Sequence, residues 1–182
     1  VSVPLVFAVL LHDVAKPVTA TVDKTGRIRF NEHDRIGAEM SEAIMRRLRF
    51  SGAEIEATVE MVRQHMVFKD VPKMRVAKLK RFMARPTFND ELELHRVDCE
   101  SSHRMLDNYK FLLRKREEFA NEPIIPPPLV RGDDLIAPDL KPGPKFGEIL
   151  EAVETRQLEG KLHTREEALE WVKREYSLGR NE

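Results

Sequence analysis

Cysteine is nearly absent from the 182-residue sequence: Cys99 stands alone, which excludes an internal disulfide framework and fits a reducing compartment such as the cytoplasm. Excess charge of either sign is also absent, because 31 basic residues balance 31 acidic ones. Overall charge therefore gives no case for nucleic-acid binding, and any such case must rest on local patches. The apolar run 3–11 is far shorter than the roughly 20 residues of a membrane span, so we expect no membrane association.

The sequence also lacks an initiator methionine, and it begins at Val1 within an apolar pattern typical of a helix already in progress. Natural domains seldom begin in this way. We therefore expect the chain to be the C-terminal piece of a longer protein.

Hydrophobic periodicity predicts an all-α fold with one short β-hairpin after the first helix. The first helix, residues 4–16, is expected to end at Pro17, which has no N–H to donate. The hairpin covers residues 19–30 around a turn at 23–26. Further helices are expected over 33–50, 73–85, 88–102 and 106–121, and a later one should end at about 158. Two more should begin at capping boxes: one at Ser51–Glu54, which continues to 66, and one at Thr164–Glu167.

A proline-rich segment divides the sequence. Four prolines occur between residues 121 and 128, and their fixed φ and missing N–H groups favour an extended linker. We predict a helical domain over residues 1–121, a linker over 122–130 and a small helical tail over 131–182.

The strongest local signal is His12-Asp13 at the end of the apolar run, followed by Lys16. An imidazole beside a carboxylate offers a divalent metal one borderline and one hard ligand. An ionisable pair near a core must also be paired, hydrogen-bonded or metal-bound. Lys16 lies one helical turn further on, where it is placed to meet an anion such as phosphate. Alternatively, Lys16 closes the helix dipole and pairs with Asp13.

This pattern resembles the central motif of the HD superfamily of metal-dependent phosphohydrolases. The resemblance implies an HD-type helical bundle in which one or two divalent ions, such as Mg²⁺, Mn²⁺ or Ni²⁺, are held by His12, Asp13, His33, His65 and Asp98. It also implies that Asp13 and Lys16 are catalytic in the hydrolysis of phosphomonoesters or phosphodiesters. The family has a further, upstream histidine. No histidine precedes His12 here, which agrees with a truncated chain and an incomplete first metal site.

Each of these residues also has a purely structural interpretation. His33 and His65 are expected at a helix start and a helix end, where surface residues and partners of the helix dipole are common. His95 and Asp98, three residues apart, are able to pair with each other. The metal interpretation depends on the whole set occurring in family order. His95 is expected at most to orient a metal ligand, whereas His103 and His163 are expected to lie at the surface.

The resemblance extends beyond the HD motif, to the bacterial tRNA nucleotidyltransferases that contain an HD domain, which are the CCA-adding enzymes and related poly(A) polymerases. Nearly the whole chain shares it, in segments at 26–30, 37–40, 48–51, 93–96, 108–109, 132–135, 140–144 and 157–160. These enzymes carry an N-terminal nucleotidyltransferase head with paired aspartates after a Gly-Ser motif. No such motif occurs here, so the chain alone is not expected to add nucleotides.

The tail has an RNA interpretation of its own. Lys141, Gly143 and Lys145 precede a helix whose first N–H groups are unpaired, an arrangement that suits an RNA backbone phosphate. An ordinary Pro-Gly turn with Pro144 at the first helical position explains the same residues. The basic run 73–85 also suits RNA, although such a run is commonly a solvated face.

Two functions remain open. The first is an enzyme, a phosphohydrolase that trims or repairs tRNA 3′ ends, including those with 2′,3′-cyclic phosphates. The alternative is a non-catalytic helical body and tail that binds tRNA for a separate polymerising head. A stand-alone nucleotide phosphatase is a weaker third choice, because the tail is of an RNA-binding type. The expected partners are a tRNA or other RNA 3′ end and a nucleotide or phosphate ester, and the oligomeric state is left open.

Overall fold

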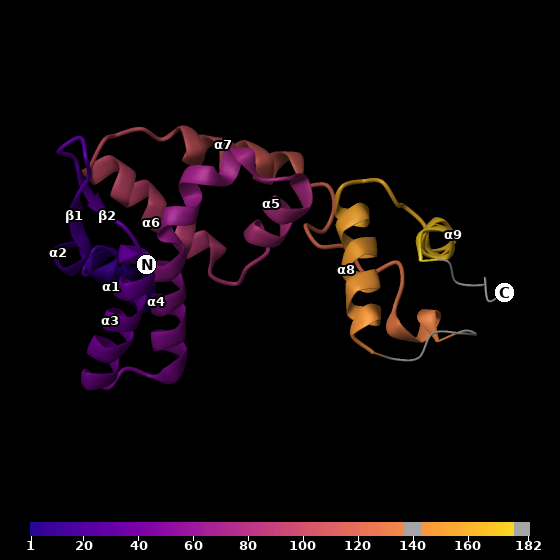
Figure 1. Ribbon diagram of the computed structural model, residues 1–182, viewed down its shortest axis with the longest axis horizontal. Coiled ribbons are helices and arrows are strands. Elements are labelled where there is room, and N and C mark those ends of the chain that lie inside the picture. The colour runs from indigo at the N-terminus through magenta and orange to yellow at the C-terminus, as the bar shows by residue number, and fades with distance from the viewer. Residues whose placement is uncertain (137–142, 177–182) are drawn as a thin grey trace. The chain divides into compact units, whose positions relative to one another are not determined.

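The computed structural model describes residues 1–136 and 143–176 (Figure 1). Contacts between residues divide the chain into two compact units, which we describe separately. The first unit comprises Val1–Lys73 and Arg85–Glu118, and the second comprises Met74–Ala84 and Phe119–Glu182. The sequence-based boundaries at residues 121 and 131 stay predictions. The contacts add one finding to them, which is that residues 74–84 belong with the C-terminal part of the chain.

The first unit is a helical bundle in which α1 (Val3–Leu11) and α3 (His33–Arg47) both pack on α4 (Gly52–Gln64) (Figure 1). The same unit contains the 3₁₀ helix η1 (His65–Lys73), α6 (Phe88–Ser101) and α7 (Asp107–Glu118). The shared core consists of apolar side chains from these helices, among them Leu5, Ala8, Met45, Val62 and Leu94. The prediction of an HD-type, all-α bundle with one hairpin is confirmed.

The first helix is shorter than the sequence predicts. α1 ends at Leu11, residues 12–15 form a turn, and a short helix α2 (Lys16–Thr19) follows with Pro17 in its first turn. Proline is tolerated there because the first N–H groups of a helix have no intrahelical partner. Pro17 therefore begins a helix rather than ending one. As a consequence, His12 and Asp13 lie at the junction of two helices instead of inside one.

The predicted hairpin is confirmed as β1 (Ala20–Val22) paired antiparallel with β2 (Ile28–Phe30). Asp23 fixes the turn between the strands, because its carboxylate accepts a hydrogen bond from the backbone N–H of Arg27. Gly26 supplies the left-handed backbone that the turn requires, with φ of 82°. The hairpin follows α2 directly, which brings it close to the junction that holds His12 and Asp13.

The second unit contains α5 (Val76–Met83), the 3₁₀ helix η2 (Gly132–Leu135), α8 (Pro144–Leu158) and α9 (Arg165–Glu175). Its core is a separate apolar cluster that includes Ile149 and Trp171, the only tryptophan of the sequence. α5 packs on α8, where the Arg81 guanidinium pairs with Glu154 at 2.5 Å. The helical tail that the sequence predicts is therefore present, with α5 as an additional helix.

Both predicted capping boxes are confirmed. Ser51 with Glu54 caps α4, and Thr164 with Glu167 caps α9; in each box the two residues satisfy each other's backbone N–H groups. Within residues 1–136 and 143–176, no helix is both long enough and apolar enough to cross a bilayer.

Candidate metal centre

Five side chains that the sequence marks as ligands meet in the first unit. They are supplied by three junctions and one helix interior: the α1–α2 turn gives His12 and Asp13, the start of α3 gives His33, the start of η1 gives His65, and α6 gives Asp98. Packing of the helices, rather than nearness in the sequence, decides where these groups meet. The structure therefore brings together the complete predicted ligand set.

The three histidines of this cluster share one orientation. In each ring Nδ1 lies 2.6–2.9 Å from the backbone carbonyl three residues earlier, which belongs to Val9 for His12, Phe30 for His33 and Val62 for His65. A carbonyl only accepts hydrogen bonds, so we assign the ring proton to Nδ1 in all three. Nε2 of each neutral ring is then left with a lone pair. Metal-binding histidines are oriented by such bonds to their second nitrogen.

His33 and His65 point their Nε2 atoms at each other across 3.1 Å. With both Nδ1 atoms protonated, two neutral rings would face lone pair to lone pair, which is repulsive unless a cation lies between them. Both residues are buried, with 6% and 7% of their surface exposed, so bulk water does little to relieve this repulsion. The pair therefore fits a shared metal ion.

Asp13 lies between His12 on one side and the His33–His65 pair on the other. Its Oδ1 is 3.6 Å from Nε2 of His33, and its Oδ2 is 3.4 Å from Nε2 of His12. Ligand atoms of Asp13, His33 and His65 all lie within 4.8 Å of one another. Nε2 of His12 lies 3.5 Å from Oδ1 of Asp98. This donor set of imidazole nitrogens and carboxylate oxygens suits a divalent transition metal, and Asp13 is placed to serve both sides.

Nε2 of His12 is a buried nitrogen that makes no hydrogen bond to any residue the structure describes. Its carboxylate neighbours are charge contacts at 3.4 and 3.5 Å. Burial by itself lowers the pKa of His12, but Asp13 and Asp98 together outweigh burial and raise the pKa to about 10. The two carboxylates thus favour a positive charge at this nitrogen, either a proton on the ring or an ion bound to it.

Asp13, Asp98 and His65 are held in the forms that bind metal. Burial raises the pKa of Asp13, but contacts with His12 and Lys16 hold it well below its usual range. His12 likewise lowers the pKa of Asp98. Burial is the main cause that lowers the pKa of His65, and the nearby His12 cation adds to it. Ionised carboxylates and neutral imidazoles are the species that coordinate metals.

Lys16 lies beside the cluster rather than within it. Its Nζ donates to Oδ2 of Asp13 at 2.5 Å and sits 5.6 Å from the centre of the Phe30 ring. The ion pair with Asp13, which the spacing allows, is therefore present. The Lys16 side chain is still 39% exposed, so it remains accessible to an anion that approaches Asp13.

A cavity of about 670 Å³ opens beside the cluster and includes Asp13, His33, His65 and Asp98 in its wall. Sequence reasoning missed four of its other lining residues: Arg27, Ile28 and Phe30 from the hairpin, and Lys69 from η1. The alternation of basic and apolar residues over 27–30 is the signal in the sequence that marks this strand. The nearness of η1 to the hairpin follows from tertiary packing and has no local signal.

His95 lines the same cavity without joining the cluster. Its ring stacks on Phe68 with 4.8 Å between the ring centres, and Sγ of Cys99 lies 3.7 Å from its nitrogens. In the described part of the chain, no ion pair joins His95 to Asp98. His103 and His163 are exposed, as the sequence predicts.

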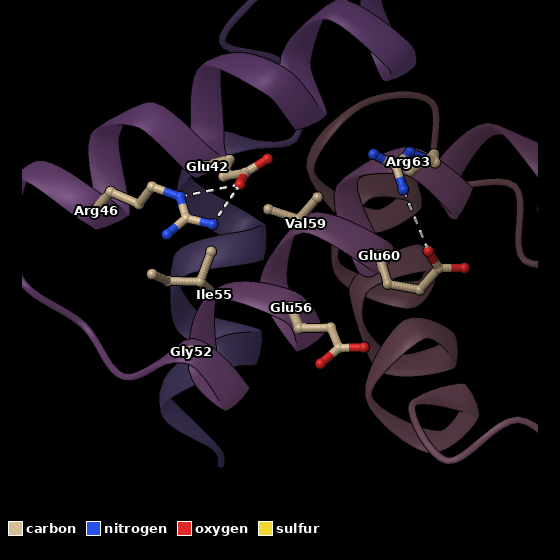
Figure 2. Close-up of a pocket in the computed structure, with 8 residues that line it drawn as sticks. All are labelled: Glu42, Arg46, Gly52, Ile55, Glu56, Val59, Glu60 and Arg63. Carbon is tan, nitrogen blue, oxygen red and sulfur yellow. Dashed lines mark hydrogen bonds and ion pairs between the residues drawn. The ribbon is translucent and has the colours of Figure 1, made fainter.

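A second hollow of about 420 Å³ lies between α3 and α4 (Figure 2). Ile55 and Val59 form its apolar part, and Arg46 pairs with Glu42 beside them. Arg63 pairs with Glu60 on the other side of the hollow, and none of its eight lining residues is a histidine, cysteine or aspartate. It offers nothing comparable to the metal centre.

The predicted RNA contacts of the tail are described only in part. Lys141 lies outside the described residues, whereas Gly143 caps the start of α8 and Lys145 is exposed in its first turn. The φ of Gly143 is 177°, an extended conformation that any residue adopts, so the fold itself does not require glycine there. In the basic run 73–85, Arg81 is engaged with Glu154 and Arg85 with Glu91, which favours a structural role for these two.

Comparisons with known proteins give a consistent result for both parts of the chain. The HD-domain family matches residues 3–113, and the family described as the second domain of tRNA nucleotidyltransferases matches residues 117–172. No solved structure matches at a significant level.

Two curated proteins are similar along most of the chain. An A-adding tRNA nucleotidyltransferase of Deinococcus radiodurans is 35% identical over 179 residues, which cover 92% of this chain and 41% of that protein. A CC-adding tRNA nucleotidyltransferase of Thermus thermophilus is 33% identical over 164 residues, which cover 88% of this chain and 37% of that protein. The chain thus spans about two fifths of the length of these relatives.

Proposed function

This chain belongs to the HD-domain family, and we propose that its metal centre hydrolyses phosphate esters at RNA 3′ ends. The second domain of tRNA nucleotidyltransferases, which matches residues 117–172, follows the HD domain along the sequence. The substrates would be phosphomonoesters or 2′,3′-cyclic phosphodiesters of tRNA. The observation that carries the proposal is the convergence of three histidine Nε2 atoms on Asp13, each ring held by a backbone carbonyl.

Two sets of residues would hold metal ions in this proposal. Asp13, His33 and His65 form one, and His12 and Asp98, with Asp13 shared, form the other. When bound, a divalent ion lowers the pKa of its water and so supplies hydroxide near neutral pH. The second set offers three protein ligands, and a further ligand would have to come from outside the described residues or from solvent.

The chain's own residues would orient the phosphate. Lys16 is the cation closest to the shared carboxylate, so it would neutralise a non-bridging oxygen of a phosphate that lies against Asp13. Phe30 packs against the Lys16 ammonium and limits where it can move. Asp13 and Lys16 are therefore the catalytic residues that we propose.

Replacement of Asp13 tests this function. Asp13→Ala should lower metal-dependent hydrolysis of bis(p-nitrophenyl) phosphate by more than about a hundredfold, because changes in groups that merely orient a ligand already cost about 10- to 100-fold. Asp34→Ala is the matched control, since Asp34 lines the same cavity but lies outside the cluster. Circular dichroism should be unchanged in both variants. Equal activity of the two variants, or a wild-type chain inactive with Mg²⁺, Mn²⁺, Co²⁺ and Ni²⁺, would contradict the proposal.

A second function is favoured by the relatives. Their names are those of A-adding and CC-adding enzymes, and their similarity to this chain continues through the second unit. In this alternative the chain is a helical body and tail that binds tRNA without hydrolysing it, through Lys141, Gly143 and Lys145. Salt-sensitive tRNA binding that needs no metal and disappears in a Lys141→Ala/Lys145→Ala variant would favour this alternative.

A further inference from the structure

The cavity beside the metal centre is larger than a phosphate requires. Its volume of about 670 Å³ falls within the range of about 300–1,000 Å³ that is usual for sites that take small organic ligands. A phosphate at Asp13 would occupy only the part of it nearest the cluster. Much of the remaining wall belongs to the hairpin, η1 and α6, so side chains of these elements would meet whatever is attached to the phosphate.

The hairpin segment 27–30 lines this space, with apolar Ile28 and Phe30 alternating with Arg27 and Arg29. Across the strand pair Ala20 faces Phe30 and Val22 faces Ile28, and alternation along each strand puts these four side chains on one face. Ile28 and Phe30 line the cavity, and Ile28 is 58% exposed. An exposed isoleucine next to a half-buried aromatic ring suits a flat, apolar ligand group such as a nucleobase.

Two basic side chains flank that face without partners of their own. Arg27 and Lys69 both line the cavity, and both are exposed. Among the ion pairs of the described residues, neither takes part in one, in contrast to Lys16 and Arg29, which pair with Asp13 and Asp23. Unpaired arginine and lysine beside an apolar surface suit the phosphates on either side of a nucleotide.

The overall charge of the cavity favours the same ligand. Its charged lining residues are balanced, with four basic and four acidic side chains. A divalent ion at the centre would leave the cavity net positive, which attracts a polyanion.

We propose that Arg27, Ile28 and Phe30, together with Lys69, form a nucleotide-binding wall that selects the terminal nucleotide of an RNA strand over small phosphate esters. This inference rests on the proposed function, since it assigns the substrate class of the same site. The base packs on Ile28 and Phe30, while Arg27 and Lys69 contact phosphates next to the one that lies at Asp13. These are specificity-determining residues, because they contact parts of the substrate that do not react.

Binding measured without metal tests the wall directly. The probe is a 5′-fluorescein-labelled RNA oligomer ending in a 2′,3′-cyclic phosphate, whose anisotropy is titrated in EDTA at several salt concentrations. Arg27→Ala and Lys69→Ala should each lower the slope of log affinity against log salt by about 0.7, the value for one contact to single-stranded nucleic acid. Lys24→Ala is the control, since Lys24 is an exposed cation in the same hairpin that does not line the cavity.

A second pair of variants tests the apolar part. Ile28→Ser should weaken binding of the oligomer by about tenfold, the scale of one lost base contact. Val22→Ser is its control, because Val22 is the cross-strand neighbour of Ile28, is 69% exposed and does not line the cavity. Hydrolysis of bis(p-nitrophenyl) phosphate with metal should be unchanged in the two control variants, Lys24→Ala and Val22→Ser, which lie outside the cavity.

The outcomes separate this inference from the proposed function. If Arg27→Ala and Lys69→Ala bind like Lys24→Ala, or if the chain binds the oligomer no better than a mononucleotide, the wall is wrong even though the small ester is hydrolysed. If the chain hydrolyses neither substrate, the proposed function fails, while the anisotropy titration still decides whether the wall binds RNA.

Discussion

The two units differ in whether they bury polar side chains. The first unit buries six polar or charged residues, including His33 and His65 of the metal centre and Glu91. In the described residues of the second unit, no polar or charged side chain is buried. Its core is apolar throughout, and its ion pairs, such as Arg165 with Asp134, lie at the surface.

This difference shows where each unit obtains its stability. Apolar burial stabilises the second unit without specific partners. The first unit also encloses imidazoles and carboxylates, whose burial is unfavourable unless each finds a partner or a metal. Natural proteins accept such local conflicts at functional sites. The contrast therefore supports our proposal that the chemistry belongs to the first unit.

The largest effect should follow from a cavity in the second core. Ile149 is fully buried there, and Ile149→Ala should lower the free energy of unfolding by about 2–5 kcal/mol. Trp171 is the only tryptophan and belongs to this core, so its fluorescence reports the unfolding of the second unit. Leu94→Ala, at an equally buried position in the first unit, should move the unfolding curve measured by circular dichroism but not the fluorescence curve. If both curves move together in the Leu94→Ala variant, the units are one cooperative structure.

Metal should stabilise only the first unit. A metal ion that binds the folded state alone, at 100 times its dissociation constant, adds about 2.7 kcal/mol to the free energy of unfolding. Mn²⁺ or Ni²⁺ should therefore slow hydrogen exchange in peptides from α3 and α6, while exchange in α8 and the Trp171 fluorescence midpoint stay constant. Asp13→Ala should remove the effect. Equal protection of α8 would contradict the assignment of the metal centre to one unit.

Much of the candidate metal centre is predictable from the sequence, because His12-Asp13 is a local signal and the family resemblance adds His33, His65 and Asp98. His12-Asp13, His33, His65 and Asp98 each stand at a recognisable position in a helical pattern, and the structure brings them together. The resemblance to a known family orders them as one set. The carbonyls that orient the histidines are also local, since each lies three residues before its ring.

Other features depend on contacts that no local pattern records. The end of α1 at Leu11 follows from the turn that directs His12 and Asp13 toward α3 and α6, whereas the sequence suggests a helix continuing to Pro17. The 3₁₀ helix η1 and the association of α5 with α8 likewise depend on tertiary packing. Long-range packing also creates the cavity, so the sequence does not indicate that Arg27 and Lys69 line it.

The pH dependence of stability should also differ between the units when EDTA removes metal. The pKa of His12 is raised from 6.5 to about 10 in the folded state, so its contribution is complete below pH 6.5 and is lost as pH rises toward 10. The pKa values of Asp13 and Asp98 are lowered, so their contribution is present above about pH 4 and is lost in more acidic solution.

Denaturation by urea at pH 7 and pH 9.5 checks the alkaline part of this prediction. The midpoint for the first unit, followed by circular dichroism, should fall at pH 9.5, whereas the Trp171 fluorescence midpoint should stay constant. A His12→Gln variant, which cannot titrate, should be less stable at pH 7 and should show no alkaline loss. An alkaline loss of equal size in this variant would mean that His12 is not its source.

The smallest effects concern the helix capping boxes, which occur in both units and so allow a direct comparison. Ser51→Ala removes the cap of α4 in the first unit, and Thr164→Ala removes the cap of α9 in the second. Each change should cost about 1 kcal/mol, because one orphan backbone N–H loses its side-chain acceptor in either case. Only Thr164→Ala should shift the Trp171 fluorescence midpoint, and neither should alter hydrolysis, since neither residue lines the cavity. If the two variants lose equal free energy of unfolding, the units differ in their buried groups and not in how their helices are capped. A markedly larger loss in Ser51→Ala would mean that strain from the metal centre reaches the far end of α4.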